Sequence, residues 1–140
     1  MLSFSNFFTR GVKNTLKFKN GAQLAHAGPW VQVYPDTVID EWFLGDFMSA
    51  EYTITVDYDT NHKETIKCLM VAGPNVANVI IYGRVNLGKK LIDVTAQVDG
   101  SRAYLVASPA TNTGAPPTTF PGSKLIFSAN YFQTINELTL

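Results

Sequence analysis

The residues whose spacing comes nearest to a metal site lie in the stretch DYDTNHKE. Asp57, Asp59 and Asn61 alternate as the first ligands of an EF-hand calcium loop do. That loop also needs glycine at its sixth position and glutamate at its twelfth. Here those positions hold His62 and Cys68. The stretch is therefore interpreted as the polar turn of a β-hairpin, with adventitious binding of a divalent cation as the alternative.

A second stretch, GRVNLGKK, nearly matches a phosphate-binding loop. Gly83, Gly88 and Lys89 have the required spacing, but Lys90 stands where that loop needs serine or threonine. The residues that follow, LIDVTAQV, are typical of a strand, so no helix N-terminus is expected to face a phosphate. We interpret the stretch as a hairpin turn with two solvated lysines.

Other patterns for catalysis or metal binding fail on residue type or spacing. His26 and His62 do not stand at the spacing of metal ligands, and Cys68 has no second cysteine beside it in the sequence. No GxSxG motif of a nucleophilic serine occurs. The acidic residues that could form a glycosidase pair qualify only by type: Asp40, Glu41 and Asp46. We expect no catalytic residue, no metal site, no cofactor and no enzymatic activity.

Composition favours one packed domain, because 46% of the 140 residues are hydrophobic and only 16% are charged. Residues 1–35 carry four cations and no acid, whereas acidic residues gather in residues 36–64. This asymmetry would let the basic residues 1–35 of one subunit bind the acidic residues 36–64 of another. Four cations are too few to predict a nucleic-acid partner. No apolar run approaches the roughly 18 residues of a membrane span, and no signal-peptide pattern is visible.

The elements that would position any site fall into two parts. Residues 1–46 are predicted to form an N-terminal arm with few regular elements, and residues 47–140 a β-sandwich domain. Within the arm, WVQVY predicts a short strand. A short helix is expected over residues 3–13, because three aromatic residues stand at helical spacing. They are Phe4, Phe7 and Phe8.

From residue 49 onward the pattern is almost continuously that of β-strands. EYTITVDYD and ETIKCLMVAG alternate and predict a hairpin with one buried face. Its inward residues are expected to be Tyr52, Ile54, Val56, Ile66, Cys68 and Met70. The apolar run ANVIIYGR predicts a strand buried on both faces. KKLIDVTAQV, RAYLVAS and KLIFSANYF complete about six strands, which favour an all-β fold, an antiparallel β-sandwich or jelly-roll-like domain.

Aromatic residues near the front of the chain allow three interpretations: they cap the sandwich core, they anchor a neighbouring subunit, or residues 3–13 lie on a membrane surface. Trp42 is expected in the core. The long loop over residues 109–122 is expected to be mobile or held by a partner. The residues predicted to contact a partner are Phe4, Phe7, Phe8, Arg10, Trp30, Pro116, Pro117 and Phe120.

Residues 49–135 also resemble a known group of proteins. The segments that carry the resemblance are EYTI, ETIK…VAGP, YGR.NLG, VDGS and SANYFQT. They are similar to a small β-domain in virion structural proteins of marine tailed phages, notably those that infect cyanobacteria. The resemblance implies a non-enzymatic particle component, assembled in the host cytoplasm and repeated by symmetry.

On this basis we expect a capsid decoration or cement subunit that binds neighbouring capsid proteins through its arm and loops. A neck, tail or fibre-attachment subunit is the alternative. Its partners would be other virion proteins, such as the major capsid protein or tail and neck proteins, or further copies of itself, and neither nucleic acid nor membrane. The alternative of another class is a glycan-binding module in which Tyr104, Phe120 and Tyr131 line a shallow sugar-binding face.

Overall fold

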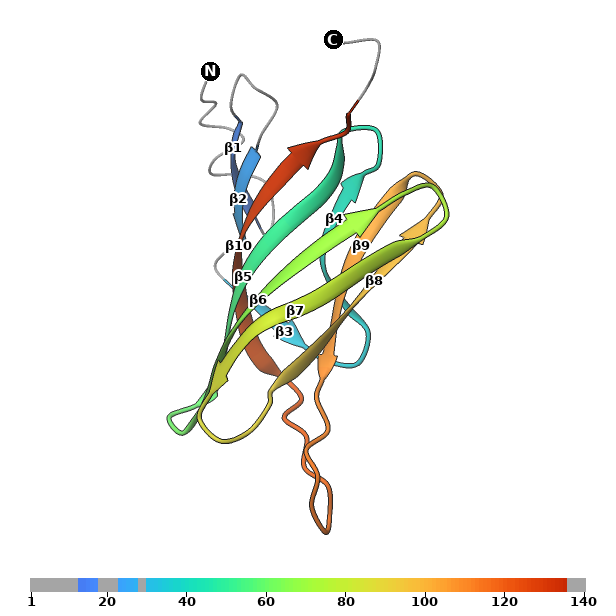
Figure 1. The fold of residues 1–140 in the computed structure, drawn as a ribbon. Helices are drawn as coiled ribbons and strands as arrows, with labels where there is room; N and C mark the ends of the chain where they lie inside the picture. The colour runs from blue at the N-terminus through green and yellow to red at the C-terminus, as the bar shows by residue number, and fades with distance from the viewer. Residues whose placement is uncertain (1–12, 18–22, 28–29, 136–140) are drawn as a thin grey trace.

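The computed structural model describes residues 13–17, 23–27 and 30–135, which form ten strands and no helix (Figure 1). The strands are β1 (Lys13–Lys17), β2 (Gln23–Ala27), β3 (Val31–Val33), β4 (Thr37–Phe43), β5 (Phe47–Asp59), β6 (His62–Ala72), β7 (Ala77–Asn86), β8 (Ile92–Asp99), β9 (Arg102–Pro109) and β10 (Ser123–Gln133). The all-β fold predicted from the sequence is confirmed.

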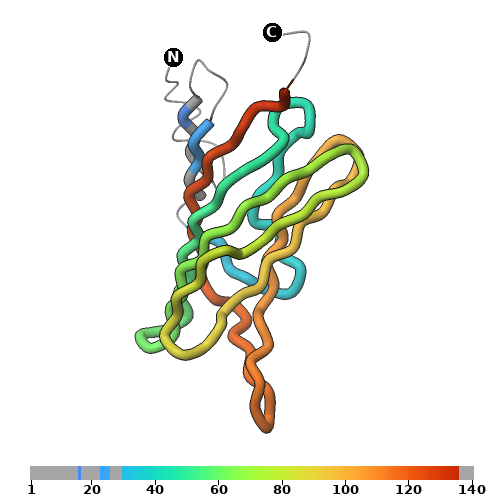
Figure 2. Tube along the Cα trace, viewed as in Figure 1, coloured from blue at the N-terminus to red at the C-terminus, as the bar shows by residue number. Residues whose placement is uncertain are grey.

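The strands form two antiparallel sheets that pack as a sandwich (Figure 2). The large sheet has seven strands in the order β1-β2-β10-β5-β6-β7, with β3 pairing to the start of β10. The small sheet has three strands in the order β4-β9-β8. The chain passes from the large to the small sheet between β3 and β4 and again between β7 and β8. The sandwich therefore depends on crossovers, and its central hairpin, β5–β6, lies inside the large sheet.

The core lies between the sheets and follows the alternation of β5 and β6. Tyr52, Ile54 and Val56 are fully buried on β5, and Ile66 and Cys68 are fully buried on β6. Residues between them on each strand face outward, since neighbouring side chains on a strand point to opposite faces. The hairpin and its inward residues are as the sequence predicted.

The prediction that the third strand is buried on both faces is wrong. This strand, β7, is an edge strand of the large sheet, and none of the described residues covers its outward side chains. Ile80 is 63% exposed and Tyr82 is 49% exposed. A bulge between Lys67 and Cys68 of β6 leaves Tyr82 without a partner in the strand register. The apolar run thus has one inner face and one apolar outer face.

Regular structure is more frequent over residues 1–46 than the sequence suggested. β2 pairs with β10, and β4 is an outer strand of the small sheet. Ile39 and Trp42 of β4 are buried in the core, which confirms the expectation for Trp42. Most of the predicted helix, residues 3–12, lies outside the described residues, and Lys13 begins β1. The boundary between arm and domain stays a prediction.

Candidate docking surfaces

A loop between β9 and β10, residues 110–122, projects beyond the end of the sandwich (Figure 1). The outgoing and returning segments of the loop are joined by a β-bridge between Asn112 and Thr118, whose backbone groups exchange two hydrogen bonds of 2.8 and 3.1 Å. The Asn112 side chain accepts a bond from the Lys90 N–H at 3.0 Å and donates to the Lys90 carbonyl at 2.8 Å. The base of the loop is thereby fixed to the β7–β8 connection.

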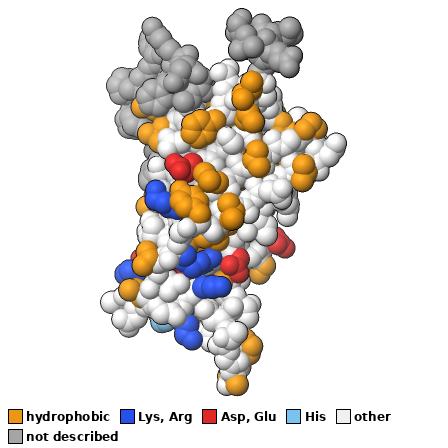
Figure 3. Space-filling model, viewed as in Figure 1, with side chains coloured by type: hydrophobic (Ala, Val, Ile, Leu, Met, Phe, Trp, Pro, Cys, Tyr) orange, Lys and Arg blue, Asp and Glu red, His pale blue; other side chains and the backbone are white. Residues whose placement is uncertain are grey.

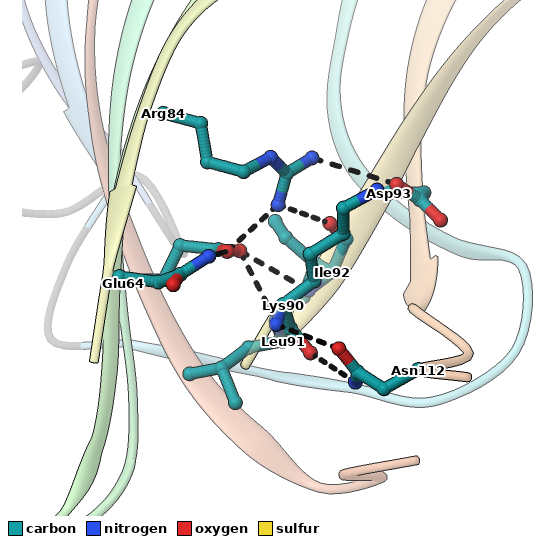
Figure 4. A network of polar contacts seen from close by, with 8 residues as sticks. Glu64, Arg84, Lys90, Leu91, Ile92, Asp93 and Asn112 are labelled. Atoms are coloured by element: carbon teal, nitrogen blue, oxygen red, sulfur yellow. Dashed lines mark hydrogen bonds and ion pairs between the residues drawn. The ribbon is translucent and has the colours of Figure 1, made fainter. Parts of the chain in front are cut away.

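That connection is itself held by a buried carboxylate (Figure 4). The side chain of Glu64 is fully buried and accepts the N–H groups of Leu91 and Ile92 at 3.3 and 3.2 Å. Arg84 donates to Glu64 at 2.7 Å and to the Ile92 carbonyl at 3.1 Å. Charge-assisted bonds of this kind are the stronger ones in proteins. The loop base is therefore anchored, through residues 90–92, to the core side of β6.

The tip of the loop, residues 113–117, is exposed along its whole length and carries Pro116 and Pro117. A different contact fixes the return of the loop. Phe120 is only 7% exposed, and its ring lies 5.1 Å from that of Tyr58 and 4.7 Å from that of His62. We therefore describe the tip as an exposed apolar end on a stem that the Asn112–Thr118 bridge holds. That the loop is mobile or held by a partner stays a prediction.

The structure describes four of the eight residues predicted to contact a partner. Pro116, Pro117 and Trp30 are exposed, and the Lys124 ammonium lies 5.0 Å from the centre of the Trp30 ring. Phe120 is buried against the rings of Tyr58 and His62. The four others lie outside the described residues: Phe4, Phe7, Phe8 and Arg10. Partner contact through any of these residues stays a prediction.

A second surface lies on the outer face of the large sheet. Hydrophobic side chains gather over β5, β6 and β7 on this face, and charged ones lie further along it (Figure 3). We define the outer patch as the four exposed large hydrophobic residues that line this surface, which are Leu69, Val71, Ile80 and Phe132. They are 46–63% exposed and line an apolar groove of about 450 Å³. Alternation on β6 and β7 could have found this surface, since Leu69 and Ile80 fall on the outward positions.

Acidic residues that suggested calcium binding have other partners in the structure. Asp57 pairs with Lys63 at 2.8 Å, and Asp59 binds Nδ1 of His62 at 2.7 Å. The hydrogen bond to His62 lowers the pKa of Asp59 from its ordinary value of 3.8. No group of three metal-ligating side chains occurs among the described residues. The stretch is the polar end of the β5–β6 hairpin, as the sequence predicted.

The glycine-rich stretch has the two exposed lysines that were predicted, but the predicted hairpin turn is wrong. Gly88 has a φ of 88°, and the next regular element is strand β8 rather than a helix. The connection is not a hairpin turn, because β7 and β8 belong to different sheets. Lys89 and Lys90 follow Gly88 on the surface.

Of the acidic residues considered as a glycosidase pair, Asp40 and Glu41 lie on opposite faces of β4, and Asp46 is exposed in the turn before β5. Asp40 is buried between the sheets, where its Oδ2 accepts hydrogen bonds from the hydroxyls of Tyr52 at 2.7 Å and Tyr131 at 2.5 Å. Glu41 follows it on the strand and is exposed on the opposite face, 3.5 Å from Arg102. Burial, and then the charge of Asp40, raise the pKa of Tyr52 and of Tyr131. This cluster ties the two sheets together.

The predicted sugar-binding face is not formed. Tyr131 is buried between the sheets, Phe120 is buried under the hairpin end, and Tyr104 lies in the middle of the small sheet. Sequence reasoning also missed Glu64, although a signal was present. Glu64 shares the inward positions of β6 with Ile66 and Cys68, and a carboxylate in such a place needs a buried partner.

Comparison with known proteins gives structural neighbours among phage tailspikes and no family. No protein-family model matches the chain, and no curated protein matches it. The tailspike protein of Acinetobacter baumannii phage AM24 matches 93% of the chain at 12% identity and a TM-score of 0.41. Tailspike protein gp49 from Acinetobacter baumannii bacteriophage Fri1, described as a capsular polysaccharide depolymerase, matches 97% at 14% identity and a TM-score of 0.42. The chain spans about a quarter of the length of these tailspikes, 24% and 22%.

These neighbours correct one expectation. The sequence led us to expect no enzymatic activity, but one of the two tailspikes is described as a depolymerase. That expectation is therefore withdrawn. The structural neighbours are phage tail proteins, and a cyanobacterial or marine source finds no support among them.

In the described part of the chain, no helix is long and apolar enough to cross a membrane.

Proposed function

We propose that the chain is a structural subunit of a tailed-phage virion, which attaches to neighbouring virion proteins through the projecting loop. The resemblance of residues 49–135 to virion β-domains supports the virion context. The braced loop is the observation that carries the attachment role. Its exposed tip projects beyond the end of the sandwich (Figure 1), and its stem is held by the hydrogen bonds between Asn112 and Lys90.

The physical reason is preorganisation. A flexible loop loses conformational entropy when it is ordered by a partner, at a cost of about 0.5–1.5 kcal/mol for each immobilised side chain. Here the bridge between Asn112 and Thr118 has already ordered the stem. The tip residues Ala115, Pro116 and Pro117 carry no charge and have little side-chain entropy to lose. Such a tip suits insertion into an apolar pocket on a neighbour.

Within the virion, the primary proposal is a decoration or cement subunit on the capsid surface, with the major capsid protein as its partner. The alternative is a neck, tail or fibre-attachment subunit. In either position the N-terminal residues would supply a second contact to neighbouring proteins. They are Phe4, Phe7, Phe8 and Arg10. The two positions differ in which purified particle part should bind the chain.

The test uses the full chain and heads and tails purified separately from the phage that encodes it. Residues 113–117 are replaced by a Gly/Ser segment of equal length, and Pro74→Ser in the exposed β6–β7 turn serves as the matched control. We expect the tip variant to lose binding by at least about tenfold, while Pro74→Ser binds as the unmodified chain does. Binding to heads would support decoration, and binding to tails would support the alternative. Equal binding by the tip variant, or no binding to either part, would overturn the proposal.

A further inference from the structure

We propose that the outer patch is the surface at which a second copy of this chain docks, so that the protein forms a two-fold dimer. This inference goes beyond the proposed attachment role, which uses a different surface. The patch lies on the face of the large sheet, whereas the loop tip projects from the end of the sandwich (Figure 1, Figure 3).

The apolar part of the patch is continuous across the strands. Phe132 of β10 lies beside Ser49 of β5, which lies beside Val71 of β6. In the next outward row, Leu69 of β6 lies beside Ile80 of β7. All four patch residues leave about half of their surface or more in solvent. Contiguous exposed apolar surface of this kind is typical of interaction sites.

Charged residues beside the patch indicate which kind of partner it binds. Glu51 lies directly across from Leu69 on β5, and Lys67 lies two residues before Leu69 on the same face of β6. The Tyr82 hydroxyl donates a 3.1 Å hydrogen bond to Glu51 and fixes its carboxylate at the edge of the patch. Lys67 is exposed and makes no ion pair within the described residues. The patch therefore carries one acid and one base around an apolar centre.

Geometry makes these two charges complementary to their own two-fold image. Strand spacing puts Glu51 about 4.8 Å from Leu69, and the rise along a strand puts Lys67 about 6.8 Å from it. A two-fold axis that lies in the plane of the interface near Leu69, and that bisects the directions from Leu69 to Glu51 and to Lys67, would stack this leucine on Leu69 of the second copy. The same rotation would bring Lys67 opposite the second copy's Glu51, and Glu51 opposite its Lys67. Closed two-fold dimers require such self-complementary surfaces.

Other occupants fit the charges less well. A lipid surface or a nucleic acid would need an excess of cations around the patch, and the patch holds equal numbers of each sign. The patch has four side chains on three strands, whereas a standard interface has roughly 20–30 residues on each side. We therefore expect a weak dimer, with a dissociation constant of about micromolar order in solution.

The experiment is sedimentation velocity on the full chain at concentrations from about 1 to 100 μM, the range that brackets such a dissociation constant. We expect a monomer at the lowest concentration and a dimer at the highest. Leu69→Lys should remain monomeric throughout. Val38→Lys is the matched control, because Val38 is 49% exposed and lies on β4 of the small sheet. It should dimerise as the unmodified chain does.

A charge exchange makes the test specific to the proposed geometry. Glu51→Lys and Lys67→Glu should each raise the dissociation constant at least about tenfold, because each places like charges opposite one another. The double variant should restore dimerisation, since the opposite signs are exchanged but kept. Circular dichroism and thermal unfolding of each variant verify that the chain is folded.

Several results would overturn the inference. They are a chain that stays monomeric at all concentrations, a Leu69→Lys variant that dimerises normally, and a double charge variant that is not restored. A Leu69-dependent binding to lipid vesicles by a strictly monomeric chain would also overturn it in favour of a membrane surface. The loop-tip variant should dimerise normally and Leu69→Lys should still bind particles, so failure of this inference is distinguishable from failure of the attachment role.

Discussion

The hydroxyl of Tyr52 donates a 2.7 Å hydrogen bond to the carboxylate of Asp40, and this bond joins the two sheets in the middle of the core. Tyr52 lies on β5 of the large sheet and Asp40 on β4 of the small one. The same hydroxyl accepts a 3.2 Å bond from the indole N–H of Trp42. A buried carboxylate is tolerated here because hydroxyl groups surround it. The cluster orients the small sheet on the large one.

Replacement of Tyr52 by phenylalanine tests this cluster. Tyr52→Phe keeps the ring but removes one donor from Asp40 and the acceptor from Trp42. We expect the free energy of unfolding to fall by about 1.5–3 kcal/mol, the range for hydrogen bonds to charged groups. Urea denaturation followed by tryptophan fluorescence measures the loss. Tyr104→Phe on the small sheet is the control and should cost less than about 0.5 kcal/mol. Equal stability of Tyr52→Phe and the unmodified chain would contradict the role of the cluster.

Alkaline pH should unfold the chain because of the same tyrosines. Burial raises the pKa of Tyr52 and Tyr131, and the nearby charge of Asp40 raises it further, so the folded state holds these protons more tightly than the unfolded state. The stability from protonated Tyr52 and Tyr131 is complete below the unfolded value of about 10 and is lost as pH rises above it. Near-ultraviolet absorbance of tyrosinate, recorded with circular dichroism, should show these two residues ionising only together with unfolding. Ionisation of all six tyrosines in a folded chain would be the contrary result.

The Glu64–Arg84 pair should be the most sensitive ion pair of the described chain. Glu64→Gln removes the charge that Arg84 and two backbone N–H groups contact, and leaves the partly buried Arg84 with the exposed Asp93, 3.4 Å away, as its acidic partner. Breaking a buried pair costs about 3–5 kcal/mol. Glu41→Gln is the control, because its pair with Arg102 is exposed and worth about 0–1 kcal/mol. Thermal unfolding measures both, and a similar loss in the two variants would contradict the prediction.

The single cysteine should report opening of the core. Cys68 is fully buried, and burial raises the pKa of its thiol to about 12. Both effects suppress the reactive thiolate. We expect reaction with a disulfide reagent at pH 8 to be at least about a thousandfold slower than in urea-unfolded protein, given ordinary domain stabilities. Fast labelling in native buffer would indicate that β5 and β6 separate readily. Cys68→Ala, which cannot react, gives the background rate.

The sequence predicted the parts of this fold that depend on local alternation. The hairpin of β5 and β6 and the burial of Tyr52 and Ile66 follow from residues close together in the chain. The burial of β7 on both faces was predicted wrongly, because an apolar strand has the same sequence pattern whether both of its faces are covered or one of them is exposed. Only the sheet order shows that β7 is the last strand of its sheet.

Polar features could be predicted only in part, for a different reason. Asp40 and Tyr131 are separated by 91 positions, and nothing in a single sequence indicates their contact. Glu64 was recognisable as an inward carboxylate from its position on β6, but its partner Arg84 was not. The clamp of the loop depends on Asn112 reaching Lys90, which again requires the three-dimensional arrangement. Long-range polar contacts of this kind set the position of the loop.

The central place of β10 has a consequence for how the protein is made. β10 is the last of the described strands to be synthesised, yet it pairs with β2, β3 and β5 and so joins three parts of the large sheet: the β1–β2 pair, β3, and the β5–β6–β7 group. In a nascent chain that has not yet reached residue 123, β2, β3 and β5 each lack the partner that β10 provides. Folding must therefore wait until β10 leaves the ribosome, and its long-range pairings make it slow, in milliseconds to seconds. During that interval the unfinished sheet is the form that chaperones would bind and that aggregates most readily.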